Sequence, residues 1–480
     1  MYRLLFLFVC LFGSGAIAQT ESGSDWPAFL GPDATGVARE VDIADTWPED
    51  GPPLVWEKKV GTGYSAPSVR GDRLVLHHRI DDEEIVQAYN AKTGKASWLY
   101  KNDTEFKDPY GYNNGPRCTP LLTTTHCYTL GAAGHLACVE LETGEKVWSR
   151  DLQAEYQIPR AFFGIGCTPI LEGDKLVVLV GGQRPRNPTS KGTRPCGVVA
   201  FDSKTGKPLW NAVGKSTWDG VVTPKRGPYK WTGEETVVSY SSPIAATINN
   251  KRHLLCLTRQ GLVSLDPETG KERFKYWFRA TVHESVNAAR PVVIGDKILL
   301  SAAYGLGSVL LKVNSDGNEV EEVWRDRRNL LAHWSTPIVS KGFAYGFSGR
   351  HENEGELRCI DLKDGSVKWS TDGYDKENGR VVYDQERQKF TNTKTGKFVP
   401  RPLFGRGSKI RVGDKFVILG ERGLLALANV NPKKYDEISR TEFKQIHYPA
   451  WTAPVLSRGL LYLRCEDALV CLNLRPKPRN

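Results

Sequence analysis

The feature that most constrains this chain is a strand pattern repeated along its length. Each copy begins with a small residue, a proline and apolar residues, then passes through a Gly-Asp-Lys or similar turn into a second strand. A third strand leads through an Asx-x-x-Thr-Gly turn to a fourth, which carries an aromatic residue. The proline or its equivalent stands at positions 67, 120, 169, 243, 291, 337, 409 and 454. Four strands in a period of about 50 residues, with two longer spacings for insertions, predict a β-propeller of eight blades.

The ends of the chain predict how the ring closes. The eighth copy, from Pro454, has three strands and ends at Leu474 without a fourth. A strand of the missing type, with its aromatic Trp56, lies near the N-terminus at residues 54–60. Pairing the two removes an open sheet edge. We therefore expect an all-β, eight-bladed propeller of four-stranded blades at residues 54–475, closed by an N-terminal strand that completes the last blade. An extension (19–53) precedes it, and a tail (476–480) follows.

Composition agrees with a turn-rich β protein, since the chain holds 47 Gly and 28 Pro and is 40% hydrophobic. In the repeated turns, glycine supplies a positive φ and the Asx side chain caps nearby amides. We expect the fourth-strand tryptophans to fill the wedge between neighbouring blades.

The first 18 residues resemble a secretory signal. Arg3 gives the positive start, residues 4–12 form an apolar run, and Ala16-Ile17-Ala18 fits the cleavage rule. The apolar run is too short to span a membrane. We expect an exported protein, periplasmic or extracellular after cleavage near Ala18, with no membrane span and monomeric.

The cysteine spacing and the distribution of charge bear on whether the chain holds a zinc site, disulfides or nucleic acid. Nine cysteines remain after cleavage, with no C-x-x-C pair and no adjacent pair, so the spacing does not indicate a zinc site. Most lie in apolar strand-like runs, which predicts buried thiols with one disulfide at most. The net charge of +10 is spread along the chain without a basic helix. This distribution does not favour nucleic acid as a partner.

Turn lengths indicate which face carries function. The short uniform turns share one face, so the long variable segments share the other, here called the funnel face. The segments entering the first strands there supply the candidate ligand-binding residues: Arg117, Arg160, Phe163, His283, Glu284, Arg290, His333, Trp334, Arg406, His447 and Trp451. Arginines and aromatics around a funnel suit an anionic or flat ligand, a peptide or a protein. The insertion at 371–400, with a hairpin expected within 381–399, is either a lid on this face or decoration.

These motifs resemble the PQQ-like repeat, which is shared by quinoprotein alcohol dehydrogenases and the propeller lipoprotein of the outer-membrane β-barrel assembly machinery. Residues 25–32 and 461–475 look like those of secreted bacterial single-domain members. The resemblance implies the propeller fold over residues 25–475. In the dehydrogenases it also implies a quinone with calcium on the axis and an aspartate base. This chain lacks their vicinal cysteine pair and offers no residue-level match for the calcium ligands or the base. Glu284 and Asn287 are candidates by residue type alone.

Two functions stay open from the sequence. The first is an exported binding or scaffold platform that uses the funnel face. The alternative is a PQQ- and calcium-dependent quinoprotein dehydrogenase acting on alcohols or sugars. A carbohydrate hydrolase or lyase ranks last, because it needs two carboxylates at catalytic distance and the funnel segments offer mostly Arg and His.

Overall fold

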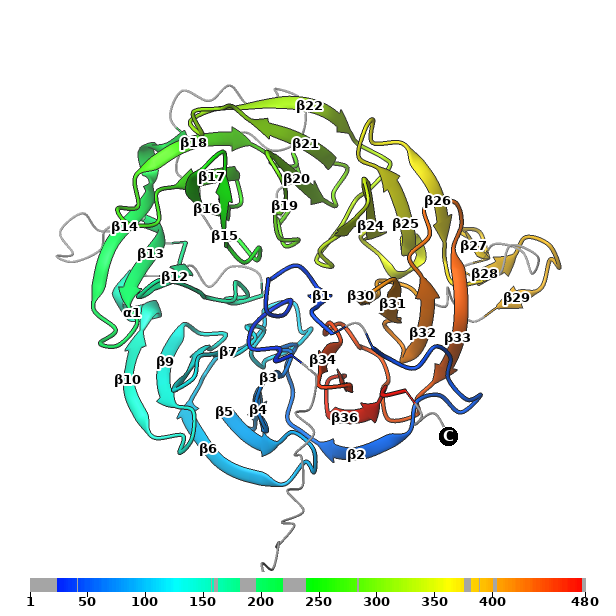
Figure 1. Cartoon of the computed structure of the whole chain (residues 1–480), viewed down its shortest axis with the longest axis horizontal. Helices are drawn as coiled ribbons and strands as arrows, with labels where there is room; N and C mark the ends of the chain where they lie inside the picture. Colours follow the sequence, from blue (N-terminus) through cyan, green and yellow to red (C-terminus); the bar gives the residue numbers. More distant parts are fainter. Residues whose placement is uncertain are drawn as a thin grey trace, which may run out of the picture.

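The structure, a computed structural model, describes residues 24–40, 42–156, 158, 163–181, 196–218, 239–282, 285–374, 381–387, 389–399 and 404–476. Within these residues, eight blades of four strands stand around a central axis, and each runs from an inner to an outer strand (Figure 1). The sheet of blade 7 gains a fifth strand from the N-terminal segment. The predicted eight-bladed β-propeller is confirmed.

The first four blades follow the order of the chain. Blade 1 holds β3 (Ser68–Arg70), β4 (Arg73–Ile80), β5 (Glu83–Asn90) and β6 (Ala96–Asp103), and blade 2 holds β7 (Leu121–Leu122), β8 (His126–Leu130), β9 (His135–Glu140) and β10 (Lys146–Asp151). The short helix α1 (Leu152–Tyr156) then leads to blade 3, with β11 (Ile170–Glu172), β12 (Lys175–Leu179), β13 (Cys196–Asp202) and β14 (Pro208–Gly214). After the 3₁₀ turn η1 (Lys215–Trp218), blade 4 holds β15 (Ile244–Ile248), β16 (Lys251–Leu257), β17 (Gly261–Leu265) and β18 (Glu272–Trp277).

The last four blades carry the insertion and the ring closure. Blade 5 holds β19 (Val292–Ile294), β20 (Lys297–Ala302), β21 (Gly307–Val313) and β22 (Val320–Asp326), and blade 6 holds β23 (Ile338–Ser340), β24 (Phe343–Ser348), β25 (Glu356–Asp361) and β26 (Val367–Thr371), with η2 (Glu352–Glu354) inside it. Blade 7 holds β30 (Ser408–Val412), β31 (Lys415–Leu419), β32 (Leu424–Asn429) and β33 (Asp436–Glu442). Blade 8 combines β34 (Val455–Ser457), β35 (Leu460–Arg464) and β36 (Ala468–Asn473) with β2 (Leu54–Lys59).

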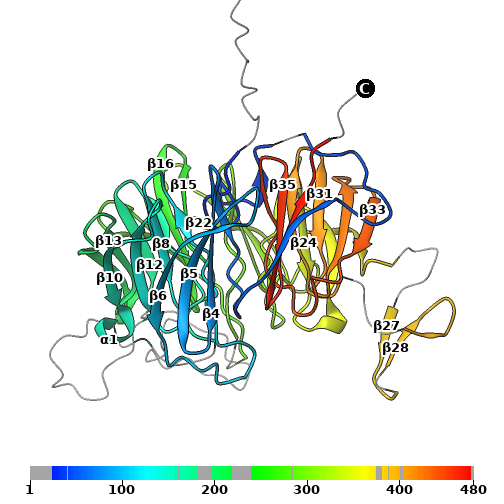
Figure 2. The same ribbon diagram turned by 90° about the horizontal axis from the view of Figure 1, so that it is seen from below.

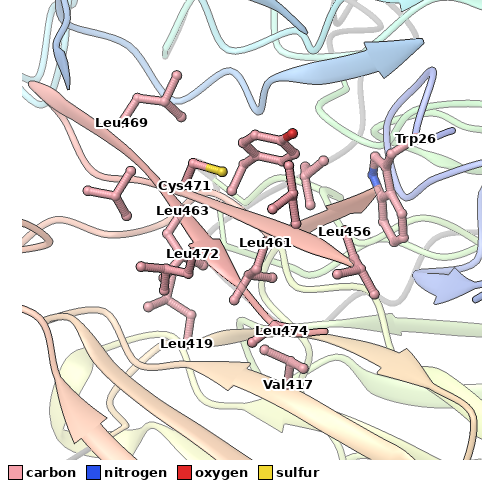
Figure 3. Packing of buried hydrophobic residues seen from close by; sticks show 14 of the residues in the cluster. Trp26, Val417, Leu419, Leu456, Leu461, Leu463, Leu469, Cys471, Leu472 and Leu474 are labelled. Atoms are coloured by element: carbon pink, nitrogen blue, oxygen red, sulfur yellow. The ribbon is translucent and has the colours of Figure 1, made fainter. Parts of the chain in front are cut away.

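The ring closes where the sequence predicts. β2 runs antiparallel to β36, with Trp56 opposite Cys471, and forms the outer strand of blade 8 (Figure 1). Buried side chains of blades 7 and 8 form one cluster around this seam, and Figure 3 shows Leu461, Leu472 and Leu474 packed together within it. Strands from opposite ends of the chain thus bury one shared core.

The fourth-strand tryptophans join each blade to the next by a repeated contact. The indole N–H of Trp98 donates to the carbonyl of Leu141 at 3.0 Å, and that of Trp148 donates to Ser203 at 2.9 Å. Each ring lies on the Thr-Gly turn of the following blade, where a Cβ on Gly144 would stand 2.4 Å from the Trp98 ring. The glycine is needed both for its φ of +76° and for this close approach. The expected wedge-filling role is therefore accompanied by a directional hydrogen bond.

The N-terminal segment closes the axis at the face of the short turns. β1 (Val37–Ala38) pairs in parallel with β30 on the axis side of blade 7. Trp26 is 1% exposed, and its backbone forms an isolated antiparallel β-bridge with Val69 of blade 1. Figure 3 places its ring beside Leu456 of blade 8. In Figure 2 both ends of the described chain lie at this face, whereas α1 lies at the opposite, funnel face.

The insertion forms a small sheet of its own. β27 (Val381–Asp384), β28 (Lys389–Asn392) and β29 (Phe398–Val399) pair in sequence, which confirms the expected hairpin and adds a third strand. The sheet stands at the perimeter beside blades 6 and 7 rather than over the axis (Figures 1 and 2). This position favours decoration over a lid.

Two further expectations concern thiols and membrane spans. Eight cysteines lie within the described residues as buried free thiols: Cys118, Cys127, Cys138, Cys167, Cys256, Cys359, Cys465 and Cys471. In the part of the chain that the structure describes, no helix has the length and apolar character needed to cross a membrane.

Candidate functional site

Aromatic side chains and arginines gather at the funnel face. Their rings form a connected chain, with centroids 5.1 Å apart between Tyr64 and Trp451, 6.3 Å between Tyr112 and Trp451, and 5.7 Å between Tyr112 and Phe163. We call this set the aromatic–arginine patch, and its members are Tyr64, Tyr110, Tyr112, Phe163, Trp334, Arg406, Arg422, Tyr448 and Trp451. They come from the segments that enter the first strands of blades 1, 2, 3, 6, 7 and 8, and Arg422 comes from the loop after β31.

A buried ion pair lies under the centre of the patch. Nε of Arg406 donates to Oε2 of Glu421 at 3.1 Å, and the side chains are 15% and 1% exposed. The guanidinium stands 4.6 Å from the ring centre of Trp451 and 5.3 Å from that of Trp334. The indole N–H of Trp451 donates to the same carboxylate oxygen at 2.8 Å. The entries of blades 7 and 8 thus converge on one carboxylate, and Trp334 from the entry of blade 6 packs against the Arg406 guanidinium.

The pKa of Glu421 reflects two opposing effects. Burial is the larger effect and raises this pKa above its ordinary value, while Arg406 and the Trp451 N–H oppose the shift. Arg406 and the Trp451 N–H therefore offset part of the free-energy cost of burying the Glu421 carboxylate.

The rim of the patch is exposed. Among the described residues, four aromatic side chains are more than a third exposed, and three of them are Tyr110, Tyr112 and Tyr448 at 49%, 53% and 39%. The guanidinium of Arg422 lies 4.4 Å from the ring centre of Tyr448 and is held by Nε donation to Glu352 at 2.7 Å. Exposed rings are therefore already oriented by neighbours in the same chain.

His333 lies beneath the patch, next to Trp334. Its side chain is partly buried, and Tyr304 contacts its Nε2 at 3.1 Å. Burial, followed by the positive charges of Arg406 and Arg350, lowers the pKa of His333 to about 3. His333 is consequently neutral at physiological pH, and it packs and orients rather than binding anions.

Two of the expected ligand residues serve the framework. Arg117 pairs with Asp108 at 2.8 Å and bonds to the carbonyl of Asn113, with its side chain 10% exposed. Arg290 is 3% exposed and donates from Nε to the carbonyl of Pro243 at 3.0 Å, with Phe29 of the N-terminal segment over its guanidinium. Burial lowers the pKa of Arg290 to about 9. Because Arg290 contacts Phe29 of the N-terminal segment, its side chain points toward the face of the short turns and away from the funnel face.

Of the other candidate residues, five lie in or beside the patch and three lie outside the described residues. Phe163, Trp334, Arg406 and Trp451 belong to the patch, and His447 lies at its edge with Nε2 2.8 Å from Oδ1 of Asp467. Arg160, His283 and Glu284 lie outside the described residues. The candidate set lacked Tyr64, Tyr110, Tyr112, Tyr448 and Arg422 of the patch, and Glu421 beneath it. The four tyrosines could have been found from the aromatic content of their blade-entry segments.

The blade count, the repeated turns and the patch define a PQQ-like repeat propeller, and a family comparison makes this specific. The model of the family described as "Outer membrane protein assembly factor BamB" matches residues 111–371, more than half of the chain. The chain therefore belongs to this family of PQQ-like propellers.

A curated relative and solved structures agree with the assignment. An outer membrane protein assembly factor BamB of Burkholderia pseudomallei is 26% identical over 210 residues, which are 40% of this chain and 46% of the relative. The chain thus matches about half the length of that relative. BamB of Moraxella catarrhalis has a TM-score of 0.52 at 14% identity, over 89% of this chain and 98% of that one. A quinohemoprotein alcohol dehydrogenase of Comamonas testosteroni has a TM-score of 0.61 at 13% identity, over 95% and 81%. These structural likenesses show the fold alone.

The buried carboxylate beneath the patch does not fit a calcium–quinone site of the dehydrogenase type. Calcium takes oxygen ligands, but both oxygens of Glu421 accept bonds from Arg406. Asn287 is 3% exposed, and its Nδ2 donates to the carbonyls of Thr258 and Phe278 at 2.9 and 3.0 Å. Among the described side chains, the group with three metal donors is His447, Cys465 and Asp467, which includes sulfur.

Proposed function

We propose that this protein is an exported docking platform that binds a partner protein through the aromatic–arginine patch of the funnel face. The observation that carries the proposal is the cluster of exposed tyrosines at 49%, 53% and 39% exposure around two arginine-capped rings. Tyrosine, tryptophan and arginine are the residues that contribute most to binding at protein interfaces.

The distribution of exposed apolar groups supports this choice of surface. Leu99, Val147, Leu209 and Val323 are exposed one to a strand on the outer strands of different blades. Single exposed aliphatic residues are ordinary on a soluble protein, whereas a contiguous aromatic set indicates a binding surface.

The internal contacts of the patch support tight recognition. Tyr110 lies 5.2 Å and Tyr112 5.7 Å from Phe163, and Tyr448 lies 5.8 Å from Trp451. Rings already packed against one another lose little freedom when a partner binds. The guanidiniums of Arg406 and Arg422 are paired with Glu421 and Glu352, so we expect the partner to bring apolar and aromatic groups rather than a dense negative charge.

Family and sequence bear on the kind of partner. The relatives are named as outer membrane protein assembly factors, and the first 18 residues have the pattern of a secretory signal. We therefore infer that the partner lies outside the cytoplasm and is a protein of cell-envelope assembly.

Site-specific photo-crosslinking tests the proposal. A photoreactive residue replaces Tyr112, and a second variant carries it at Leu99 on β6, which is 54% exposed against 53% for Tyr112. We expect a discrete crosslinked protein in cells of the native organism with the Tyr112 probe and none with the Leu99 probe. Absence of a product from Tyr112, or the same product from both positions, contradicts the proposal. If Tyr448→Ala in the Tyr112 probe protein abolishes the crosslinked product, the contact extends across the whole patch.

A further inference from the structure

A second group of functional atoms lies beside the patch, where two loops meet. His447 belongs to the segment that enters blade 8, and Cys465 and Asp467 belong to the loop between β35 and β36. Nε2 of His447 is 2.8 Å from Oδ1 of Asp467, and Sγ of Cys465 is 3.7 Å from the same oxygen. The three donor atoms all lie within 4.8 Å of one another.

The hydrogen bonding of His447 directs Nε2 into this group. Its Nδ1 lies 3.0 Å from the carbonyl oxygen of Tyr448, a group that only accepts, so Nδ1 carries the proton in the neutral ring. Nε2 lies 2.8 Å from Oδ1 of Asp467. The position between these two atoms takes either a proton, which makes the ring a cation that donates to the carboxylate, or a metal ion that both atoms ligate. Histidine metal ligands are commonly oriented in this way, by donation of the second nitrogen to a backbone carbonyl.

Neighbouring contacts hold the two loops in place. The backbone carbonyl of Asp467 accepts from Val60 at 2.8 Å, next to the ring-closing strand β2. Glu466 is used separately, since its Oε1 accepts from Thr62 and Asn113 at 2.8 and 2.9 Å. Asp467 therefore presents its carboxylate to His447 and Cys465 without competition from its neighbour.

We infer that His447, Cys465 and Asp467 form a binding site for a zinc-class divalent metal, with a fourth position open to water or to a donor from a partner. Sulfur, imidazole and carboxylate donors together favour Zn²⁺ over calcium or magnesium. Tetrahedral ligands at the usual zinc distances stand about 3.4 Å apart. The observed spacings reach this value with small shifts, which the half-exposed side chains of His447 and Asp467 permit.

The site differs from what cysteine spacing could indicate. No C-x-x-C pair occurs in the chain, and the three ligands come from two separate loops of blade 8, the segment between β33 and β34 and the loop between β35 and β36. Bound metal joins the segment carrying Tyr448 and Trp451 to the loop after β35. Metal binding is independent of partner docking and is measurable on the isolated protein.

Metal titration of the chelator-treated full-length protein tests the inference. We expect one equivalent of Zn²⁺ to bind, with affinity weakened at least about 10-fold in His447→Ala and in Asp467→Asn. His351→Ala serves as the matched control, because His351 is also exposed on the funnel face and lies beside a carboxylate, that of Glu354. Equal Zn²⁺ affinity of the wild type and His447→Ala overturns the inference.

Cobalt supplies a readout that loss of folding does not imitate. Co²⁺ in this site gives a near-ultraviolet thiolate charge-transfer band, which we expect to vanish in Cys465→Ser while circular dichroism confirms the fold. A Co²⁺ complex without a thiolate band overturns the assignment of Cys465. In that case the metal binds without the sulfur donor that favours the zinc class, which overturns the inference as stated.

Discussion

Nε of Arg406 lies 3.1 Å from Oε2 of Glu421, a side chain that is 1% exposed, and the Arg406 guanidinium contacts the rings of Trp334 and Trp451. This pair joins the entry of blade 7 to the loop after β31, at the point where the entries of blades 6 and 8 also arrive. The exposed rings of Tyr112 and Tyr448 pack against Trp451, which bonds to this carboxylate.

Breaking the buried pair should be costly. Glu421→Ala leaves the Arg406 guanidinium enclosed without its counter-charge and removes the acceptor of the Trp451 N–H. We expect the free energy of unfolding to fall by about 3 kcal/mol, measured by urea denaturation. The more exposed pair of Arg422 and Glu352 is the control, and Glu352→Ala should cost less than about 1 kcal/mol. Equal effects of the two substitutions would contradict this account.

The contact between blades predicts a smaller, specific loss. Trp148→Phe keeps an aromatic ring over Gly206 but removes the hydrogen bond to Ser203. We expect a loss of about 1 kcal/mol in the free energy of unfolding. Val147→Ala, next to it on the exposed side of β10, should change stability by less than about 0.5 kcal/mol. A Trp148→Phe protein as stable as the wild type would show that the hydrogen bond contributes nothing.

Acid stability should depend on His333. Its pKa is lowered to about 3 by burial, so the folded state binds fewer protons than the unfolded state between pH 3 and 6.5. Stability contributed by neutral His333 is therefore present above pH 6.5 and lost as the pH falls toward 3. In His333→Gln, the slope of unfolding free energy against pH should decrease by about 1.4 kcal/mol per pH unit in this window. An unchanged slope would mean that His333 is protonated in the folded state.

Substitution of Lys409 should raise, rather than lower, the free energy of unfolding. Its side chain is buried on the innermost strand of blade 7, and its Nζ has no hydrogen-bond partner among the described residues. Burial lowers its pKa to about 7, so the unfolded state binds more protons between pH 7 and 10.5. Lys409→Met should raise the free energy of unfolding at pH 7 by about 2 kcal/mol, with a smaller gain toward pH 10. A destabilised Lys409→Met protein would contradict this reading.

The sequence predicted the ring because the ring is repetitive. The turns at Gly94 and Gly144 and the aromatic of each fourth strand recur with a period, and Trp56 at one end matches the strand missing at the other. The same periodicity separated the two faces. It placed Phe163, Trp334, Arg406 and Trp451 on the side where they gather.

The remaining details depend on contacts that do not repeat. Arg290 stands at a blade entry like Arg406, but it is directed to Phe29 in the N-terminal segment, whose position has no periodic signal. The approach of Trp334 to Trp451 joins blades 6 and 8, which are not adjacent, and depends on the curvature of the ring. The group of His447, Cys465 and Asp467 likewise combines two loops whose spacing in sequence carries no metal motif.

The docking claim is tested most directly by the affinity of the partner captured through Tyr112. Two double variants are matched in exposure: Tyr112→Ala with Tyr448→Ala on the patch, at 53% and 39%, and Leu99→Ala with Val147→Ala on outer strands, at 54% and 40%. We predict that the patch variant binds the partner at least about 100-fold more weakly than the wild type, while the outer-strand variant binds equally well. Dissociation constants within twofold of the wild type for both variants would contradict the account.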